Sequence, residues 1–391
     1  MKTLVLKAGI KLLAIVYAPL KLFRTDSEKV VFLSRQSNEP TNDFLLLQAE
    51  LRRQDPEVRI TCICNRIEGG AASYLSFARD TLRSLYHLAT SRVCVLDSYW
   101  PAVSVLTHKP DLTVIQMWHS LGKVKKSGLQ ATGKRGGRSV ELAEAMHMHE
   151  GYDYIVAGAP AWNQFYCEGF GCSEDQLLNI GLPRLDVLVS GQPETAAAIR
   201  AAHPELESKK VVIYAPTFRR ASGGEEVARA VDERCSAAAR ELNDASLGGD
   251  CVLVLKAHPN QPLDVPAALT CPDFSASEML SVANVVVTDY SAIAIEAAAA
   301  CVPTLYYLFD YDEYVADNGL NIDIEAEMPG CAFRDPSGIA AAVERACAGD
   351  YPYAELERYR ERYVLEDPGH STHDLAAFIA ELLGEPAPSE G

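Results

Sequence analysis

Two histidines each follow an apolar run of the sequence. His119 comes shortly after LTVI, which ends at Ile115, and His258 comes shortly after CVLVL, which ends at Leu255. A histidine near its free pKa can take up a proton at neutral pH, and nearby cations can stabilise charge on a phosphate. Histidines at these positions indicate proton transfer or phosphate binding.

Three further apolar runs are followed by residues suited to anions. Arg184 lies in NIGLPRLD, Thr217 follows VVIY, and Asp289 and Ser291 follow NVVV. Each has a structural explanation, since a single loop histidine is more often structural than catalytic and Ser291 or Asp289 could cap a helix. The start of a helix also attracts anions, because its free amides and dipole point outward. Five such positions, spread over both halves of the chain, favour one shared phosphate site.

The sequence carries no familiar motif for a nucleotide cofactor or a metal. Neither G-x-x-x-x-G-K-[ST] nor G-x-G-x-x-G occurs, and HExxH and CxxC are also missing. The acidic segment DYDE at 310–313 could bind a cation, but shaping a loop is the more common role of such a segment. We therefore expect no metal and no cofactor. The eleven cysteines, most of them in apolar runs, predict free thiols in a reducing cytoplasm.

The charge of the chain is acidic overall but unevenly distributed. The formal net charge of −17 excludes the basic footprint that nucleic acid binding requires. Two segments, 1–24 and 120–140, contain several basic residues and no acidic one. These two segments are expected to meet anions. The basic residues of the second are Lys123, Lys125, Lys126, Lys134, Arg135 and Arg138.

Residues 1–24 have the pattern of an amphipathic helix that lies on a membrane surface. The apolar run from Leu12 to Leu20 is too short to span a bilayer, which takes about 20 residues. Lys7 and Lys11, one helical turn apart, suit the anionic inner face of a membrane. A helix packed on the protein body is an alternative. A cleaved signal peptide fits less well, because no small-x-small cleavage site follows.

From residue 29 onward, short apolar runs alternate with amphipathic stretches, which predicts parallel sheets covered by helices. The expected strands of the first half are KVVFLS, EVRITCIC, RVCVLD, LTVIQMW and YDYIVAGA, and those of the second are VVIYAPT, DCVLVLKAHP, NVVVTDY and VPTLYYL. The expected helices are NDFLLLQAELRRQ, YLSFARDTLRSLYHLAT, AWNQFYCEGFG, ELNDASLGG, AIAIEAAAA and the stretch from AAVERACAGD to AAFIAELLG.

A chain of 391 residues is long enough for two domains. The alanine-rich polar stretch 190–210 marks the boundary, so the fold class is α/β with two Rossmann-like domains facing each other across a cleft. Ligands of such sheets bind beyond the carboxyl ends of the strands. The expected division is a membrane-associating segment 1–24, a first Rossmann-like domain 25–190, a second Rossmann-like domain 205–345, C-terminal helices 346–384 and a disordered tail 385–391.

Several of these segments together resemble a known family. WHSLGKVKKSG, GLPRLD, YAPTFRR, LKAHPN and VVTDYSAIAIEAAAACVPTLYYLFDYDEY occur in this order between Asp111 and Tyr314. As a set they resemble the motifs of the CDP-glycerol glycerophosphotransferases, which are the teichoic acid primases and polymerases. The resemblance implies a GT-B fold and peripheral attachment to the cytoplasmic face of the membrane. It also implies transfer of a polyol phosphate from a CDP-polyol to a membrane-bound acceptor.

The resemblance also implies roles for individual residues. His119 matches the catalytic histidine of the family, and His258 matches the histidine that holds the donor phosphates. Ala292 stands where the family has a second serine and Glu296 where aspartate is common, so the polyol contact could differ. The residues implied at the substrate are Ser120, Leu121, Gly122, Lys123, Arg184, Pro216, Thr217, Lys256, Asp289, Ser291, Ala292 and Glu296.

The expected reaction is attack of an acceptor hydroxyl on the β-phosphorus of CDP-glycerol, with release of CMP. His119 would be the general base. His258, Arg184 and the amides at Thr217 and Ser291 would stabilise the pyrophosphate charge, so that no metal is required. The basic residues expected to guide a lipid-linked acceptor or the anionic membrane surface are Lys125, Lys126, Lys134, Arg135 and Arg138, with Lys123 beside them.

Other functions remain possible from the sequence alone. The donor could be CDP-ribitol or another CDP-polyol, and a GT-B glycosyltransferase would use a nucleotide sugar on the same fold. A non-catalytic, membrane-associated anion-binding module is the alternative from a different class. The sequence leaves open which polyol is moved, whether the enzyme primes or polymerises, what the acceptor is, and the oligomeric state.

Overall fold

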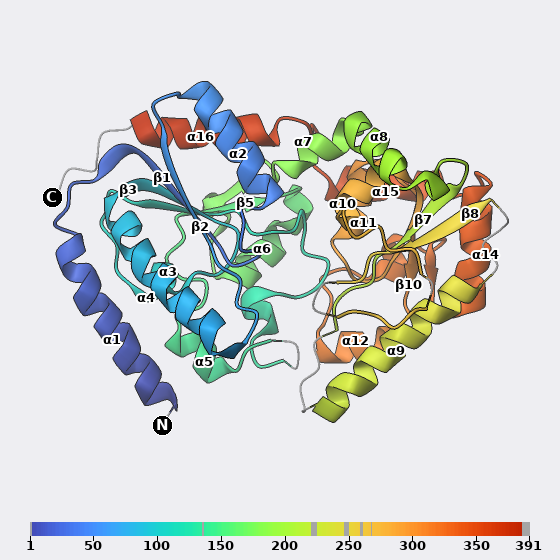
Figure 1. The fold of residues 1–391 in the computed structure, drawn as a ribbon, viewed down its shortest axis with the longest axis horizontal. Coiled ribbons are helices and arrows are strands. Elements are labelled where there is room, and N and C mark those ends of the chain that lie inside the picture. The colour runs from blue at the N-terminus through green and yellow to red at the C-terminus, as the bar shows by residue number, and fades with distance from the viewer. Residues whose placement is uncertain are drawn as a thin grey trace.

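The structure, a computed structural model, describes residues 2–134, 137–219, 225–245, 250–258, 261–266 and 268–384. It contains two parallel sheets, each flanked by helices, which lie side by side (Figure 1). The first sheet has the order β2-β1-β3-β4-β5-β6 and the second has the order β11-β10-β9-β7-β8. Every strand pair in both sheets is parallel.

The first sheet is buried by helices on both sides. Residues 29–34 of β1 and all of β3 are buried, as expected for continuous apolar strands of a covered parallel sheet. Helices α2 (Asn42–Gln54) and α16 (Ser371–Gly384) pack together on one side, and α3 (Gly70–Thr90) lies on the other (Figure 1). The strands are β1 (Asp26–Ser34), β2 (Arg59–Cys64), β3 (Ser91–Leu96), β4 (Thr113–Gln116), β5 (Tyr154–Ala157) and β6 (Leu177–Asn179).

The second sheet is covered in the same way. Helices α9 (Glu225–Asp244) and α14 (Pro336–Cys347) pack together and cover one face. Helix α11 (Ile293–Ala299) contacts β9 and β10 from the other face, with α15 (Tyr353–Tyr363) behind it. The strands are β7 (Lys210–Tyr214), β8 (Cys251–Leu255), β9 (Ala283–Thr288), β10 (Thr304–Tyr307) and β11 (Ala332–Phe333).

The two halves are joined through α7 (Arg184–Val189), which contacts α2 and α16 of the first half and α11 of the second. Helix α16 returns to the first sheet, where Arg92 Nε donates to the carbonyl of Leu382 at 2.9 Å. The C-terminal helices thus belong to both halves. The other helices are α4 (Pro101–Val105), α5 (Val140–Ala145), α6 (Asn163–Phe170), α8 (Pro193–Ala202), α10 (Ala276–Met279), α12 (Tyr311–Asp317) and α13 (Ile324–Glu327).

The N-terminal segment forms helix α1 (Lys2–Leu20), which packs against α3 and α5 (Figure 1). Tyr17 is buried and its hydroxyl lies 2.8 Å from Nδ1 of His108, which ties the helix to the body. Leu12 and Ile15 remain largely exposed. Within the described residues, no helix is long and apolar enough to cross a membrane. The predicted association of this segment with a membrane surface stays a prediction.

Most expected elements are present, with a few differences. Helix α2 occupies the expected residues 42–54, and α6 ends at Gly171, whose φ of 68° is the left-handed conformation that favours glycine. The short edge strands β6 and β11 were not expected. The helix expected at 241–249 is only the end of the longer α9, and its residues 246–249 lie outside the described part, as does the tail 385–391. The domain boundaries themselves remain predictions.

Candidate active site

His119 stands just beyond β4, on a strained turn. The preceding residue, Trp118, has a φ of 59°, a conformation that costs a bulky residue about 1–3 kcal/mol. The Trp118 amide donates to Oε1 of the buried Gln116 at 2.9 Å, which helps to hold this turn. The indole packs against the imidazole of His119, with ring centroids 4.2 Å apart. Such strain is commonly stored at functional sites.

The hydrogen bonds of His119 define its tautomer. Nδ1 lies 3.0 Å from the carbonyl oxygen of Asp97 and 3.0 Å from Nε2 of Gln36. The carbonyl can only accept, so Nδ1 carries the proton, and Gln36 meets this proton with its amide oxygen once the side-chain amide is turned over; Nε2 is then the basic nitrogen. Within the part of the chain that the structure describes, Nε2 forms no hydrogen bond. This nitrogen is therefore available to accept a proton from a substrate.

The surroundings of His119 keep it neutral. Part of the His119 side chain is in contact with solvent. The protein atoms around the imidazole nevertheless shield it from water, and this desolvation lowers its pKa to about 4. The positive charges of Arg184, Lys125 and Lys123 lower the pKa further, while the bond to Asp97 opposes the shift. At pH 7 the imidazole is a neutral base.

The carboxyl group of Asp97 anchors the backbone that orients His119. It is buried and accepts hydrogen bonds from Oγ of Ser34 at 2.7 Å and Oγ of Ser98 at 2.9 Å. Burial raises the pKa of Asp97 to about 6. The carboxyl ends of β1 and β3 thus support the histidine that follows β4.

Arg184 ties the His119 turn to both halves of the protein. Its guanidinium pairs with Asp43 of α2 and, through Nε at 2.9 Å, with Glu296 of α11. Nη2 donates to the carbonyl of His119 at 2.9 Å. Burial opposes the charge, but the carboxylates of Asp43 and Glu296 outweigh it and raise the pKa of Arg184. Arg184 and Glu296 are paired with each other in this structure, and the substrate contacts expected of both remain predictions.

The strand ends of the second sheet converge on Arg219. Its guanidinium pairs with the fully buried Asp289 and with both oxygens of Asp310, at 2.9 and 3.0 Å. The amide of Thr217 donates to Asp289 at 2.8 Å. In this structure Asp289 accepts the hydrogen bond of that amide and so supports the loop. The expected roles of the Thr217 amide and of Asp289 at the pyrophosphate remain predictions.

Thr217 and Ser291 still offer hydroxyl groups near this point. Oγ1 of Thr217 is buried and has no hydrogen-bond partner among the described residues. Ser291 is half-buried, and its Oγ accepts from the amide of Ile293 at 3.4 Å. Pro216 and Ala292 are also half-buried, and no side chain caps α11 at Ala292. Substrate contacts of these residues remain predictions.

His258 faces the same region as His119. It is exposed, and its ring stacks on Phe218 with centroids 5.1 Å apart. Burial lowers its pKa, and the charges of Lys125 and Arg66 lower it further. Because Lys125 also lowers the pKa of His119, this lysine lies close enough to affect both histidines. The two histidines that the sequence singled out come one from each half, and the charge of Lys125 acts on both.

Two lysines do not occupy the positions expected of them. Lys256 donates to the carbonyls of Thr270, Cys271 and Phe274, so it braces a loop instead of meeting the substrate. Lys123 is only 2% exposed and donates to Oγ of Ser127 at 2.7 Å. Burial lowers the pKa of Lys123 to about 7. It can therefore neither line an open donor site nor guide an acceptor at the surface.

The rest of the His119 turn fits closely against the second half. A Cβ added at Gly122 would lie 2.5 Å from Cδ1 of Ile295 on α11 and 2.6 Å from Trp162. Leu121 is buried, and Oγ of Ser120 donates to the carbonyl of Gly122 at 2.9 Å. These three residues shape the turn, and only Ser120 is partly open to solvent.

The remaining basic residues of the 120–140 segment gather at one cavity. Lys125, Lys126, Lys134 and Arg138 line a cavity of about 350 Å³ together with Trp118 of the catalytic turn. Phe218, Tyr314 and Asn318 of the second half close it, so the cavity lies between the two halves. Arg135 lies outside the described residues.

Several residues of the site were not identified from the sequence. They are Gln36, Asp43 and Asp97, together with Arg35 of the cavity beside Trp118. A signal existed, because Gln36 and Asp97 follow the apolar runs of β1 and β3. The ends of β1 and β3 were not among the five strand ends from which the site was predicted.

A metal-binding cluster is not found in the described part of the chain: no group of three or more His, Cys, Asp or Glu side chains there could hold an ion. Asp310 of the DYDE segment pairs with Arg219.

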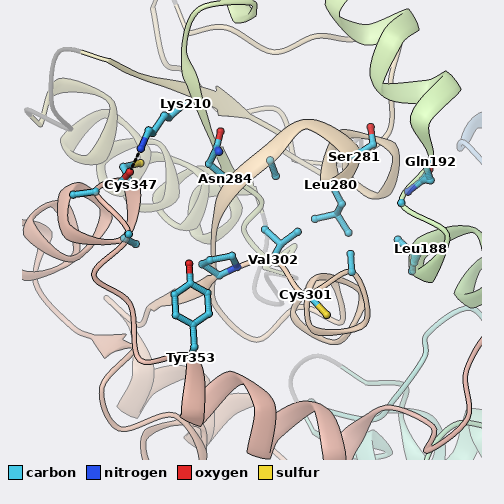
Figure 2. A pocket seen from close by; sticks show the side chains of 17 residues that line it. Leu188, Gln192, Lys210, Leu280, Ser281, Asn284, Cys301, Val302, Cys347 and Tyr353 are labelled. Atoms are coloured by element: carbon cyan, nitrogen blue, oxygen red, sulfur yellow. Dashed lines mark hydrogen bonds between the residues drawn. The ribbon is translucent and has the colours of Figure 1, made fainter.

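A second cavity, of about 500 Å³, has a different set of lining residues (Figure 2). It is lined by Lys210 and Asn284, at the amino ends of β7 and β9, and by Val302, just before β10. Ligands of parallel sheets bind at the opposite, carboxyl ends. Lys210 is the only charged side chain in its lining, and it donates to the carbonyl of Cys347. We therefore place the active site at His119.

Two parallel sheets facing each other, with a histidine from each half at the cleft, define a GT-B-like transferase of the α/β class. Over residues 16–381 the chain matches the family described as CDP-Glycerol:Poly(glycerophosphate) glycerophosphotransferase, and it belongs to that family. The protein is accordingly a CDP-polyol phosphotransferase. The family, fold class, enzyme class and function in teichoic acid synthesis that the sequence predicted are confirmed, and the sugar transferase and binding-module alternatives fall away.

Individual relatives agree with this assignment. The chain is 27% identical to a teichoic acid ribitol-phosphate primase of Bacillus spizizenii, over 93% of each chain. It is 23% identical to a teichoic acid glycerol-phosphate primase of Bacillus subtilis, over 77% of each. Its fold is similar to the solved structure of the wall teichoic acid polymerase TagF, with a TM-score of 0.71 at 18% identity, covering 98% of this chain and 97% of TagF.

Proposed function

We propose that this enzyme moves glycerol phosphate from CDP-glycerol to a hydroxyl of a lipid-linked acceptor, on the cytoplasmic face of the membrane. The observation that carries the mechanism is the neutral His119, whose Nδ1 proton is fixed by the carbonyl of Asp97. Its Nε2 takes the proton of the acceptor hydroxyl. The acceptor oxygen then bonds to the β-phosphorus, the bond from that phosphorus to the CMP oxygen breaks, and CMP leaves.

The second half of the protein would hold the donor. The exposed imidazole of His258 and the hydroxyls of Ser291 and Thr217 would contact the phosphate oxygens. Phosphoryl transfer depends mainly on positioning and on stabilisation of charge, and the cationic Lys125 lies near both histidines. Lys125 would supply positive charge there, and the hydroxyl groups would donate hydrogen bonds to the phosphate oxygens.

CDP-ribitol is the second candidate donor. The relative that matches over 93% of both chains is a ribitol-phosphate primase, whereas the family is described by glycerol. Ala292 and Glu296, which depart from the pattern of the family as a whole, follow Ser291 in the chain and leave the polyol open. The purified protein should therefore be incubated with each CDP-polyol, with UDP-sugars as controls and with membrane acceptor, and release of CMP or UDP measured.

Two outcomes would refute parts of this proposal. Absence of CMP from both CDP-polyols would refute the reaction itself. CMP release that persists at the wild-type rate in His119→Ala would refute the assigned base. A Gln36→Ala variant serves as a graded comparison, because it removes a contact to Nδ1 while the carbonyl of Asp97 still fixes the tautomer.

Membrane association is supported by apolar side chains on neighbouring helices. Leu12 and Ile15 of α1 and Leu75 and Tyr86 of α3 are exposed, and the two helices pack together. Large apolar side chains in the open are expected at a surface that meets lipid. Replacement of Leu12 and Ile15 by glutamine should release the protein from anionic vesicles in a sedimentation assay. If the protein with both replacements still sedimented with the vesicles, α1 would not be the anchor.

A further inference from the structure

The cavity of about 350 Å³ beside Trp118 has a strongly cationic wall. Arg35 follows β1, while Lys125, Lys126, Lys134 and Arg138 come from the segment after the catalytic turn. No carboxylate within the described ranges forms an ion pair with any of these five residues. Most other arginines in cavities of this protein, such as Arg184 and Arg219, are paired with acids. Five unpaired cations in one cavity require an explanation.

The cations are held close to one another in spite of their repulsion. Burial lowers the pKa of Arg35, and the charge of Arg138 lowers it further. In the same way, burial lowers the pKa of Lys134 and the charge of Lys126 adds to that effect. Gly319, with a φ of 80°, permits this approach, because a Cβ there would lie 2.9 Å from Nζ of Lys134. An anion in the cavity would relieve both repulsions.

An unsatisfied hydrogen-bond donor of Arg35 also indicates that the cavity binds an anion. Nε of Arg35 is buried and has no acceptor in the described part of the chain. A buried donor without a partner is unfavourable, so such groups usually mark a place that a ligand or water fills. Arginine forks fit phosphate oxygens in pairs. The cavity also has the size of an ordinary ligand pocket, for which about 300–1,000 Å³ is typical.

The cavity adjoins the catalytic histidine. Trp118 forms part of its wall, and the indole of Trp118 stacks on the ring of His119. Phe218, which also lines the cavity, stacks on His258. A ligand in this cavity would therefore lie beside the position at which the acceptor hydroxyl must approach Nε2 of His119.

We propose that this cavity is a subsite for the phosphate group of the acceptor, the phosphomonoester or phosphodiester nearest to the attacking hydroxyl. The subsite rests on the proposed function and specifies what the acceptor must carry. It gives the basic segment a task beside the reaction instead of at the membrane surface. Its chemistry favours a phosphorylated polyol over an unphosphorylated one as acceptor.

The test uses glycerol 3-phosphate as a minimal phosphorylated acceptor and glycerol as its phosphate-free counterpart. The subsite variant is Lys134→Gln with Arg138→Gln, which removes two cations of the cavity wall and keeps Lys125, whose charge acts on both histidines. The matched control is Arg358→Gln, an exposed arginine on α15. Binding of glycerol 3-phosphate is measured by calorimetry, and CMP release from CDP-glycerol or CDP-ribitol is measured with each acceptor and with water alone.

We expect wild type to bind glycerol 3-phosphate and to prefer it to glycerol as acceptor. The double variant should weaken glycerol 3-phosphate binding and raise its KM by roughly ten- to a hundredfold, the effect of losing a charge-assisted hydrogen bond. The KM for the CDP-polyol and the release of CMP to water should stay unchanged, and the control variant should behave like wild type.

Three results would overturn the subsite. One is unchanged binding of glycerol 3-phosphate in the double variant. Another is an increase in the KM for the CDP-polyol, which would assign the cavity to the donor. The third is loss of binding to phosphatidylglycerol vesicles with glycerol 3-phosphate binding intact, which would assign the cations to membrane lipid. Failure of the proposed function is distinguishable, because it abolishes CMP release while the calorimetric arm still tests the subsite.

Discussion

Replacement of Arg184 separates two roles that the sequence could not distinguish. The family resemblance places this arginine at the substrate, whereas in the structure it joins Asp43, Glu296 and the carbonyl of His119. If it positions His119, then Arg184→Met should lower kcat and leave the KM for the CDP-polyol nearly unchanged. If it binds donor phosphate, the same variant should raise that KM.

The magnitude follows from what the substitution leaves behind. Asp43 and Glu296 are 5% and 7% exposed, so Arg184→Met leaves two buried carboxylates without their cation. Breaking a buried ion pair on one side typically costs about 3–5 kcal/mol. The lost bond to the His119 carbonyl is charge-assisted, for which about 1.5–3 kcal/mol is typical, so kcat should fall roughly ten- to a hundredfold.

The assays are urea unfolding for stability and initial rates of CMP release for kcat and KM. A rescue variant removes the unpaired charges, with Asp43→Asn and Glu296→Gln added to Arg184→Met. It should recover much of the lost stability, because neutral amides are less costly to bury, but not the lost rate, since the bond to His119 is still missing. Arg184→Lys should fall between, because an ammonium cannot reach all three partners at once.

The reasoning would be refuted by a stable Arg184→Met protein with normal kcat and a raised KM for the CDP-polyol. Such a result would mean that Arg184 leaves its carboxylates to bind the donor. A rescue variant that regained full activity would also contradict the positioning role, since it would show that the loss came from the unpaired carboxylates alone.

Three further predictions concern the same turn. Because the pKa of His119 is lowered to about 4, kcat/KM should stay level from pH 8 to about 5 and fall only as pH approaches 4; a fall centred at 6.5 in a protein still folded by circular dichroism would contradict this. The pKa of Lys123 is about 7 in the folded protein and 10.5 in the unfolded chain, so between these pH values the unfolded chain binds one more proton. The free energy of unfolding of the wild type should therefore rise with pH in this range, by at most about 1.4 kcal/mol per pH unit. Urea unfolding at pH 7 and pH 9 should show no such rise for Lys123→Met. An equal rise in both proteins would contradict the lowered pKa of Lys123. Gly122→Ala places a Cβ 2.5 Å from Ile295 and should cost about 1–3 kcal/mol and slow CMP release, whereas Gly9→Ala, with nothing within 4 Å, should do neither.

Much of the fold could be predicted from the sequence, because parallel strands in covered sheets read as continuous apolar runs. The strands from β1 to β5 and from β7 to β10 stand where such runs occur. The two-residue β11 and the three-residue β6 are too short to give a pattern. Helix α9 begins at Glu225, whereas a helix was expected only from Glu241 onward.

The site was predictable in its residue types and not in its pairings. Strand ends pointed to His119 and His258, but partners such as Asp43 for Arg184 lie 141 residues away in the chain. Local sequence cannot show that Asp289 takes the amide of Thr217. Nor can it show that Lys123 turns inward, over the ring of Phe170 at 4.6 Å, while Lys125 two positions later stays in the open.

The segment from His119 to Lys126 performs two tasks that follow from one geometry. At its start it holds the general base, and along its length it forms the contact between the halves, because Val124 accepts from the amide of Asn321 at 2.9 Å and the amide of Lys126 donates to Gly319 at 3.1 Å. Any movement that opens the cleft must break these bonds or pull the segment along. A pull on it acts on His119, whose position depends on the carbonyl of Asp97 in the first half and on Arg184 between the halves. The position of the base thus depends on hydrogen bonds from both halves of the protein.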